Sequence, residues 1–97
     1  MQFIVIGHDY KDGLERRLEV RNQHVEQGDA MREAGNYLFG VAMLDESGKM
    51  SGSIMVMEYP SRKKLDDWLK SEPYVTNNVW EKIEIIPGHV GPSFVKK

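Results

Sequence analysis

The strands predicted at residues 37–44 and 51–59 are apolar on both faces, and this pattern constrains the fold more than any other feature. Successive residues of a strand point to opposite faces of its sheet. The first of these strands therefore has apolar residues on each side, with Tyr37, Phe39, Val41 and Met43 on one face and Leu38, Ala42 and Leu44 on the other. The returning strand repeats the pattern, with Met55, Met57 and Tyr59 opposite Ile54 and Val56. Strands of this kind belong to sheets that are covered on both sides.

The elements around this hairpin predict a ferredoxin-like α+β fold. A β-rich run at residues 2–7 predicts a first strand, and the proline-free segment 14–34, which ends before Gly35, predicts a long helix. A second helix is expected to begin after Ser61, a natural N-cap, and to end near Pro73. Residues 80–86 predict a last strand, and residues 90–95 a further short edge strand. The order β-α-β-β-α-β is the split βαβ arrangement, with two helices on one face of a four-stranded antiparallel sheet.

Two helices can cover only one face of that sheet. Each large apolar side chain left in water forfeits about 1.5–3 kcal/mol. Four or five such side chains would remove roughly the whole stability of a domain of 97 residues. A second copy of the chain is the simplest cover, so we expect a homodimer formed through the open sheet face. The alternative is that the C-terminal tail folds across this face.

Composition excludes several classes of function. The net charge of −2, without a long basic run, gives no electrostatic footprint for nucleic acid. No stretch approaches the roughly 18 apolar residues that a membrane span needs, and no secretion leader opens the chain. Cysteine is absent, and the spacing of His24 and Glu26 does not place them on one side of a helix, so we expect no metal and no cofactor. The lack of disulfides favours a cytoplasmic location. We expect residues 1–97 to form a single domain.

The long helix is expected to carry a polar row beside its core stripe. Helical spacing predicts that the stripe is apolar and consists of Leu14, Leu18 and Val25. The flank of this stripe carries a row of polar or small residues, namely Arg17, Arg21, His24 and Gly28. The glycine inside the helix predicts a bend or a close contact there. The helix would thus present a cationic edge to which an anionic or phenolic small molecule could bind.

His24 is the candidate general base of this edge. An imidazole changes charge between about pH 5 and 8, so it can take up and return a proton in a cell. Such a base needs an acceptor that holds its tautomer, and Asp9, after the first strand, and Glu72, after the second helix, are the candidates. The alternative is that Arg17 and Arg21 pair with surface carboxylates and that His24 has no role in chemistry.

The chain resembles the YciI-like (YCII-related) proteins over nearly its whole length. The residues that carry this resemblance are Asp9 after the first strand, the segment 14–24 with its Arg21-x-x-His24 step, and Glu72-Pro73-Tyr74-Val75 after the second helix. The resemblance implies a dimeric α+β barrel, with a pocket between sheet and helices in each subunit.

The resemblance also implies a catalytic dyad of a histidine and an acidic residue. His24 occupies the histidine position, and Asp9 matches the carboxylate that is usual after the first strand. Glu72 stands where the family often has Asp, and Asn22 where Pro is frequent. The residues that would bind the substrate are Arg21, Arg17 and Tyr74.

These features predict a small enzyme in which His24 transfers a proton during an elimination, isomerisation or dehydrohalogenation of a small anionic or phenolic molecule. One member of the family is a dehydrochlorinase acting on a chlorinated hydroxyquinol. The alternative is a non-catalytic dimer that binds a small ligand or another protein. Cofactor-free monooxygenases and lactone isomerases share the expected architecture, which is an analogy of fold alone.

Overall fold

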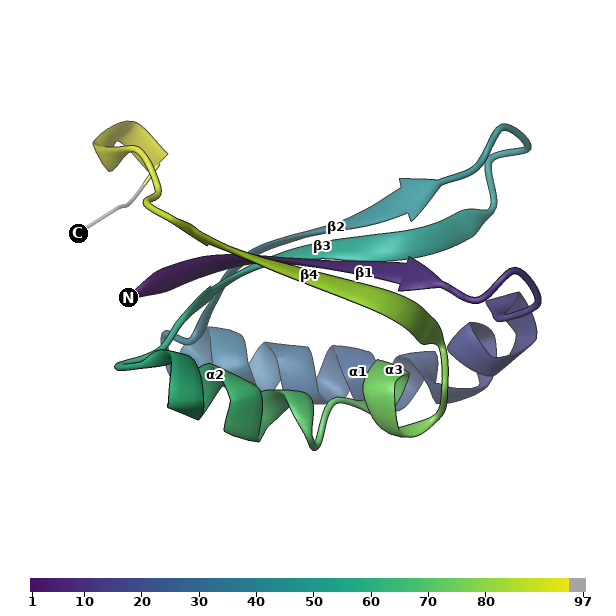
Figure 1. Cartoon of the computed structure of the whole chain (residues 1–97), viewed down its shortest axis with the longest axis horizontal. Helices are drawn as coiled ribbons and strands as arrows, with labels where there is room; N and C mark the ends of the chain where they lie inside the picture. Colours follow the sequence, from purple (N-terminus) through teal and green to yellow (C-terminus); the bar gives the residue numbers. More distant parts are fainter. Residues whose placement is uncertain (95–97) are drawn as a thin grey trace.

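Four antiparallel strands form one sheet in the computed structural model, which describes residues 1–94, and they run in the order β2-β3-β1-β4. The strands are β1 (Gln2–Asp9), β2 (Tyr37–Leu44), β3 (Met50–Glu58) and β4 (Trp80–Gly88). The helices are α1 (Leu14–Glu33), α2 (Arg62–Leu69), α3 (Pro73–Thr76) and the short 3-10 helix η1 (Pro92–Phe94). Figure 1 shows α1, α2 and α3 on the same face of the sheet. The split βαβ arrangement is therefore confirmed.

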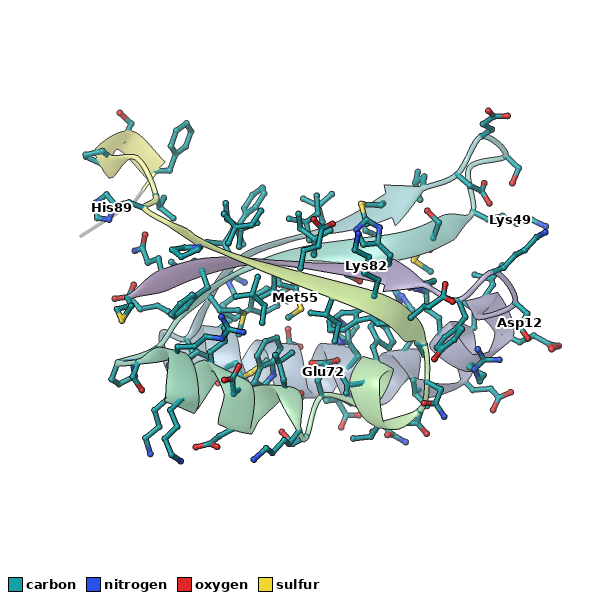
Figure 2. All side chains as sticks on the ribbon, in the orientation of Figure 1. Asp12, Lys49, Met55, Glu72, Lys82 and His89 are labelled. Carbon is teal, nitrogen blue, oxygen red and sulfur yellow. The ribbon has the colours of Figure 1, made fainter. Side chains whose placement is uncertain are left out.

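The core lies between the sheet and these helices. β1 and β3 contribute directly opposed residues to it, Phe3 beside Met57 and Val5 beside Met55, and Figure 2 shows Met55 in this layer. The other buried apolar residues of the core are Val20, Leu65, Trp68, Tyr74, Val79 and Trp80. None of the helices in residues 1–94 is long and apolar enough to cross a membrane.

Helix α1 has the predicted length, but the stripe predicted for its core side is wrong. Leu18 is 54% exposed and Val25 is also exposed, whereas Arg17, Val20 and Gly28 are buried. The inward face therefore includes Arg17 and Gly28 from the row that was expected on the flank, together with Val20. A buried arginine is unusual unless its charge is paired, and here a carboxylate satisfies it, as described below.

Strand β2 contains a bulge that changes which residues share a face. Tyr37 lies opposite Met57, but Phe39 lies opposite Val56, so the register shifts by one residue between them. Opposed residues share a face, which places Tyr37 on the helix side and Phe39 on the open side. The prediction that Tyr37 and Phe39 share a face is therefore wrong.

The middle of the open face of the sheet is apolar, as predicted, and polar residues such as His8, Lys82 and Glu84 share that face. Its paired apolar residues are Ile4, Ile6, Phe39, Val41, Ile54, Val56 and Ile86. Phe39 is 62% exposed. The strand predicted at residues 90–95 is wrong, because residues 92–94 form η1, and residue 95 lies outside the described range. Up to Phe94, the tail stays at one end of the sheet and leaves this face uncovered (Figure 1).

Candidate active site

His24 and Glu72 come together at the junction of α1 and α3. Pro73 is the first residue of α3, a position where its fixed φ favours a helix start. Glu72 caps this helix, since its Oε1 accepts a hydrogen bond from the Tyr74 backbone N–H at 3.3 Å. The same Oε1 lies 2.5 Å from His24 Nδ1. Glu72 is fully buried, and its Oε2 has no hydrogen-bond partner within residues 1–94. Figure 2 shows Glu72 in the helix layer, beside α3.

Two contacts fix the orientation of the His24 ring. Because a carboxylate only accepts hydrogen bonds, we assign the ring hydrogen to Nδ1, which faces Glu72. The ring also stacks on Tyr74, with centroids 4.0 Å apart and planes inclined by 14°. Nε2 then carries the free lone pair, and it has no partner in the described part of the chain.

Asp9 binds Arg17 and not His24. Two parallel hydrogen bonds join the side chains, from Arg17 Nε to Asp9 Oδ2 at 2.7 Å and from Nη2 to Oδ1 at 3.0 Å. Nη2 also donates to Ser53 Oγ at 2.9 Å. The Arg17 and Asp9 side chains are 2% and 4% exposed. This bidentate geometry is the strongest that arginine makes with a carboxylate.

The buried pair also supports Tyr74. The Arg17 guanidinium lies over the Tyr74 ring, 4.5 Å from its centroid, a cation–π contact. The ring also meets Trp80 edge-on at 5.8 Å. Burial raises the pKa of the Tyr74 hydroxyl, and the positive charges of Arg17 and Arg21 offset part of this increase. Tyr74 therefore stays neutral and forms a rigid platform under the imidazole.

Arg21 is the exposed arginine of this row. Over residues 1–94 it has no ion pair and no hydrogen bond from its side chain to another residue. The alternative, in which Arg17 and Arg21 pair with surface carboxylates, is therefore not seen: Arg17 is buried with Asp9, and it is Arg16 that pairs with Asp12, at 3.4 Å.

A cavity of about 190 Å³ brings these groups together between α1 and the strands β2 and β3. Its polar lining consists of Arg17, Arg21, His24, Tyr37, Ser53 and Tyr74. Two of these residues were not predicted. Ser53 is a polar residue at an inward position of an apolar strand, which is a usable signal, whereas Tyr37 enters the cavity because of the β2 bulge.

The other histidines lie elsewhere. His8 is on the open sheet face, where its Nε2 lies 2.6 Å from Glu84 Oε2. This hydrogen bond holds the pKa of Glu84 below its usual range. His89 is exposed after β4. In the part of the chain that the structure describes, no three His, Asp or Glu side chains are arranged to hold a metal ion.

Known proteins resemble this chain in sequence and in fold. The protein YciI of Escherichia coli strain CFT073 is 27% identical over 93 residues, which cover 90% of this chain and 95% of that protein. The 5-chloro-2-hydroxyhydroquinone dehydrochlorinase TftG from Burkholderia phenoliruptrix, solved with 2,5-dihydroxybenzoquinone, superposes with a TM-score of 0.84 at 16% identity, covering 96% of this chain and 98% of TftG.

A more distant structure is an antibiotic biosynthesis monooxygenase, with a TM-score of 0.54 at 14% identity, covering 94% of this chain and 98% of the other. These structural likenesses show the fold. The family model of the YCII-related domain matches residues 1–88, which is most of the sequence. The chain therefore belongs to the YCII-related domain family.

Proposed function

We propose that this protein is a homodimeric enzyme in which His24 acts as general base toward a small phenolic or anionic molecule bound in the cavity. The observation that carries the proposal is the 2.5 Å contact of His24 Nδ1 with the buried Glu72, which leaves Nε2 unpartnered on a side chain that lines the cavity. A base that is oriented by a third group is the general arrangement of acid–base and nucleophilic sites.

Glu72 acts on the base in two ways. Its carboxylate holds the tautomer in which Nε2 can accept a proton. When Nε2 takes that proton, the positive imidazolium faces a carboxylate that is shielded from water, and the attraction between charges is stronger in such surroundings. Of the two carboxylates predicted as partners, Glu72 has this role in the proposal, and Asp9 positions Arg17 and Tyr74.

Arg21 binds the anionic oxygen of the substrate. It lines the cavity beside His24 and has no carboxylate partner within the described residues, so its charge is available to a ligand. The cavity, at about 190 Å³, is smaller than the roughly 300–1,000 Å³ of sites for drug-sized ligands. A molecule with a single ring, or a smaller one, fits this space.

The chemistry is an elimination, isomerisation or dehydrohalogenation that begins when a proton is removed. In a dehydrohalogenation, Nε2 takes the proton, the electron pair of the broken bond forms the new double bond, and the halide leaves with the electrons of the carbon–halogen bond. TftG is a dehydrochlorinase of this kind by name, and the shared fold supports testing the same class of substrate here.

Turnover and binding are tested separately. Single-ring phenols, hydroxyquinones, lactones and keto acids are screened by thermal shift, since a ligand that binds only the folded state raises the melting temperature. With a ligand that is turned over, His24→Gln is expected to retain binding and to lose about 10²–10⁴-fold in kcat. His89→Gln changes an exposed histidine and is expected to retain full activity. If His24→Gln turns over the substrate as fast as the unchanged protein, His24 is not the base.

If ligands bind but none is transformed, the protein is a ligand-binding dimer without catalysis.

The open face of the sheet supports the homodimer. Phe39 is 62% exposed there, opposite Val56 and next to the Val41–Ile54 pair of the same face. Phe39→Glu is expected to shift the protein from dimer to monomer in sedimentation equilibrium at micromolar concentration. Leu18→Glu is the matched control, because Leu18 is similarly exposed but lies on α1. A monomer in the unchanged protein would contradict the proposal.

A further inference from the structure

We infer that Tyr37 determines which ligands the cavity accepts: its hydroxyl donates a hydrogen bond to a ligand oxygen, and its ring closes the cavity to molecules larger than one ring. The inference rests on the proposed function in one respect, namely that the ligand occupies the cavity beside His24. It does not depend on whether that ligand is transformed.

The ring of Tyr37 is wedged between α1 and β2. The bulge turns this side chain to the helix side of the sheet. A Cβ atom at Gly28 of α1 would lie 3.2 Å from Cε2 of the ring, which is tighter than a relaxed contact. A Cβ atom at Gly40 of β2 would overlap the hydroxyl group. The glycines on both sides therefore make room for the ring, which explains the glycine inside α1.

Tyr37 and Gly40 form the wall between two hollows. One is the cavity of about 190 Å³ that His24 and Arg21 line. The other, of about 240 Å³, lies on the far side of the same wall and is also lined by Arg32, Leu38 and Phe39. Because the tyrosine side chain belongs to both linings, shortening it would join the two spaces.

The hydroxyl of Tyr37 is available to a ligand. Within residues 1–94 this hydroxyl has no hydrogen-bond partner. Its oxygen is also not fully buried, so a ligand can reach it. Burial, followed by the charge of Glu72, raises the pKa of this hydroxyl. Tyr37 therefore keeps its proton and acts as a donor, and the matching ligand group is an acceptor such as a carbonyl, phenolate or carboxylate oxygen.

The test measures binding by calorimetry with two probes, the single-ring 2,5-dihydroxybenzoquinone and the two-ring 2-hydroxy-1,4-naphthoquinone. The unchanged protein is expected to bind the first probe and to exclude the second. Tyr37→Phe retains the wall but loses the donor, so affinity for the single-ring probe should fall about tenfold, as for one lost hydrogen bond. Tyr37→Ala removes the wall and should admit the two-ring probe. Tyr10→Phe changes a tyrosine outside this cavity and should alter neither affinity.

Three results would overturn the inference: equal binding of both probes by the unchanged protein, no binding of the single-ring probe, or the same affinity for that probe in Tyr37→Phe. If Tyr37→Ala fails to fold, Tyr37→Leu retains apolar contacts and still shortens the wall. The proposed catalysis fails through a different result, namely turnover that His24→Gln leaves unchanged. The two failures are therefore distinguishable.

Discussion

Removing the Asp9 carboxylate is expected to cost about 3–5 kcal/mol of folding stability, since loss of one partner leaves a buried charge uncompensated. Asp9→Ala would remove both acceptors of the hydrogen bonds at 2.7 and 3.0 Å and leave Arg17 with Ser53 as its remaining hydrogen-bond partner. The guanidinium is 2% exposed, so water cannot replace the carboxylate without opening the fold. For a domain of this size, such a loss lowers the melting temperature by roughly 12–40 °C.

The loss can be measured by urea unfolding followed through tryptophan fluorescence, because Trp68 and Trp80 are both buried in the core. Protein concentration is held constant, so that any association contributes equally to all variants. Asp12→Ala is the matched control: Asp12 pairs with Arg16 at 3.4 Å on the surface, and its loss should cost no more than about 1 kcal/mol.

A double replacement separates two contributions to the lost stability, that of the uncompensated charge and that of the lost packing. In Asp9→Leu combined with Arg17→Met, neither charge of this pair remains in the core, and most of the stability should return. A cost below about 1 kcal/mol for Asp9→Ala alone would refute the reasoning, because that value is typical of an exposed ion pair. It would mean that Arg17 reaches water in solution and that Asp9 is free to serve another group.

Val20→Ala should lower the free energy of unfolding by about 1–2 kcal/mol, because each buried carbon removed is worth roughly 0.8 kcal/mol. Leu18→Ala, at an exposed position, should change it by no more than about 0.5 kcal/mol, and urea unfolding measures both values. Gly7→Ala should destabilise by about 1–3 kcal/mol, because the added Cβ would overlap the Trp80 indole, and a small loss would show that this ring can move. Burial raises the pKa of three tyrosine hydroxyls, those of Tyr37, Tyr59 and Tyr74. The stability that these hydroxyls contribute is fully present below their unfolded pKa of about 10, and it is lost as the pH rises through their higher folded pKa. The urea concentration at the unfolding midpoint should therefore fall above about pH 10. The fall should be smaller in Tyr59→Phe, which lacks one of the three hydroxyls.

The order of the elements could be predicted because its signals are local. Ser61 illustrates this: a serine before a helical pattern predicts an N-cap, and its Oγ accepts the Lys64 backbone N–H at 3.2 Å. The two-sided apolar pattern of the hairpin likewise predicted an open apolar face, since each strand carries that information in its own alternation.

The rotation of α1 could not be predicted from the helix alone. Spacing placed Leu18 inside and Arg17 beside it, as the usual preferences of leucine and arginine require. The structure reverses this order because Asp9 and Ser53, from two different strands, satisfy the guanidinium. Partners that come from other elements are invisible to the periodicity of one helix.

Four residues of the cavity lining, Arg17, Arg21, His24 and Tyr74, were among those singled out from the sequence, whereas Tyr37 and Ser53 and the pairing of the carboxylates were not. Asp9 and Glu72 both end up at element ends near α1, as expected, and only the three-dimensional arrangement shows that Glu72 lies against His24 while Asp9 lies against Arg17. The contribution of Tyr37 depends on a one-residue bulge, for which strand propensity contains no signal.

The inward polar row of α1 and the apolar open face of the sheet are connected. A helix of this length normally buries an apolar stripe. Here the buried residues of α1 are Arg17, Val20 and Gly28, so that Val20 alone among them is a large apolar residue, and His24 is largely buried beside them. The face of the helix that builds the cavity therefore contributes little apolar burial to the monomer. Because a chain of 97 residues has a small core, this loss must be offset elsewhere, and the open sheet face offers exposed apolar side chains such as Phe39 and Val41 for that purpose. In the proposed dimer, association through the sheet is thus what allows α1 to carry a polar site on its inward side.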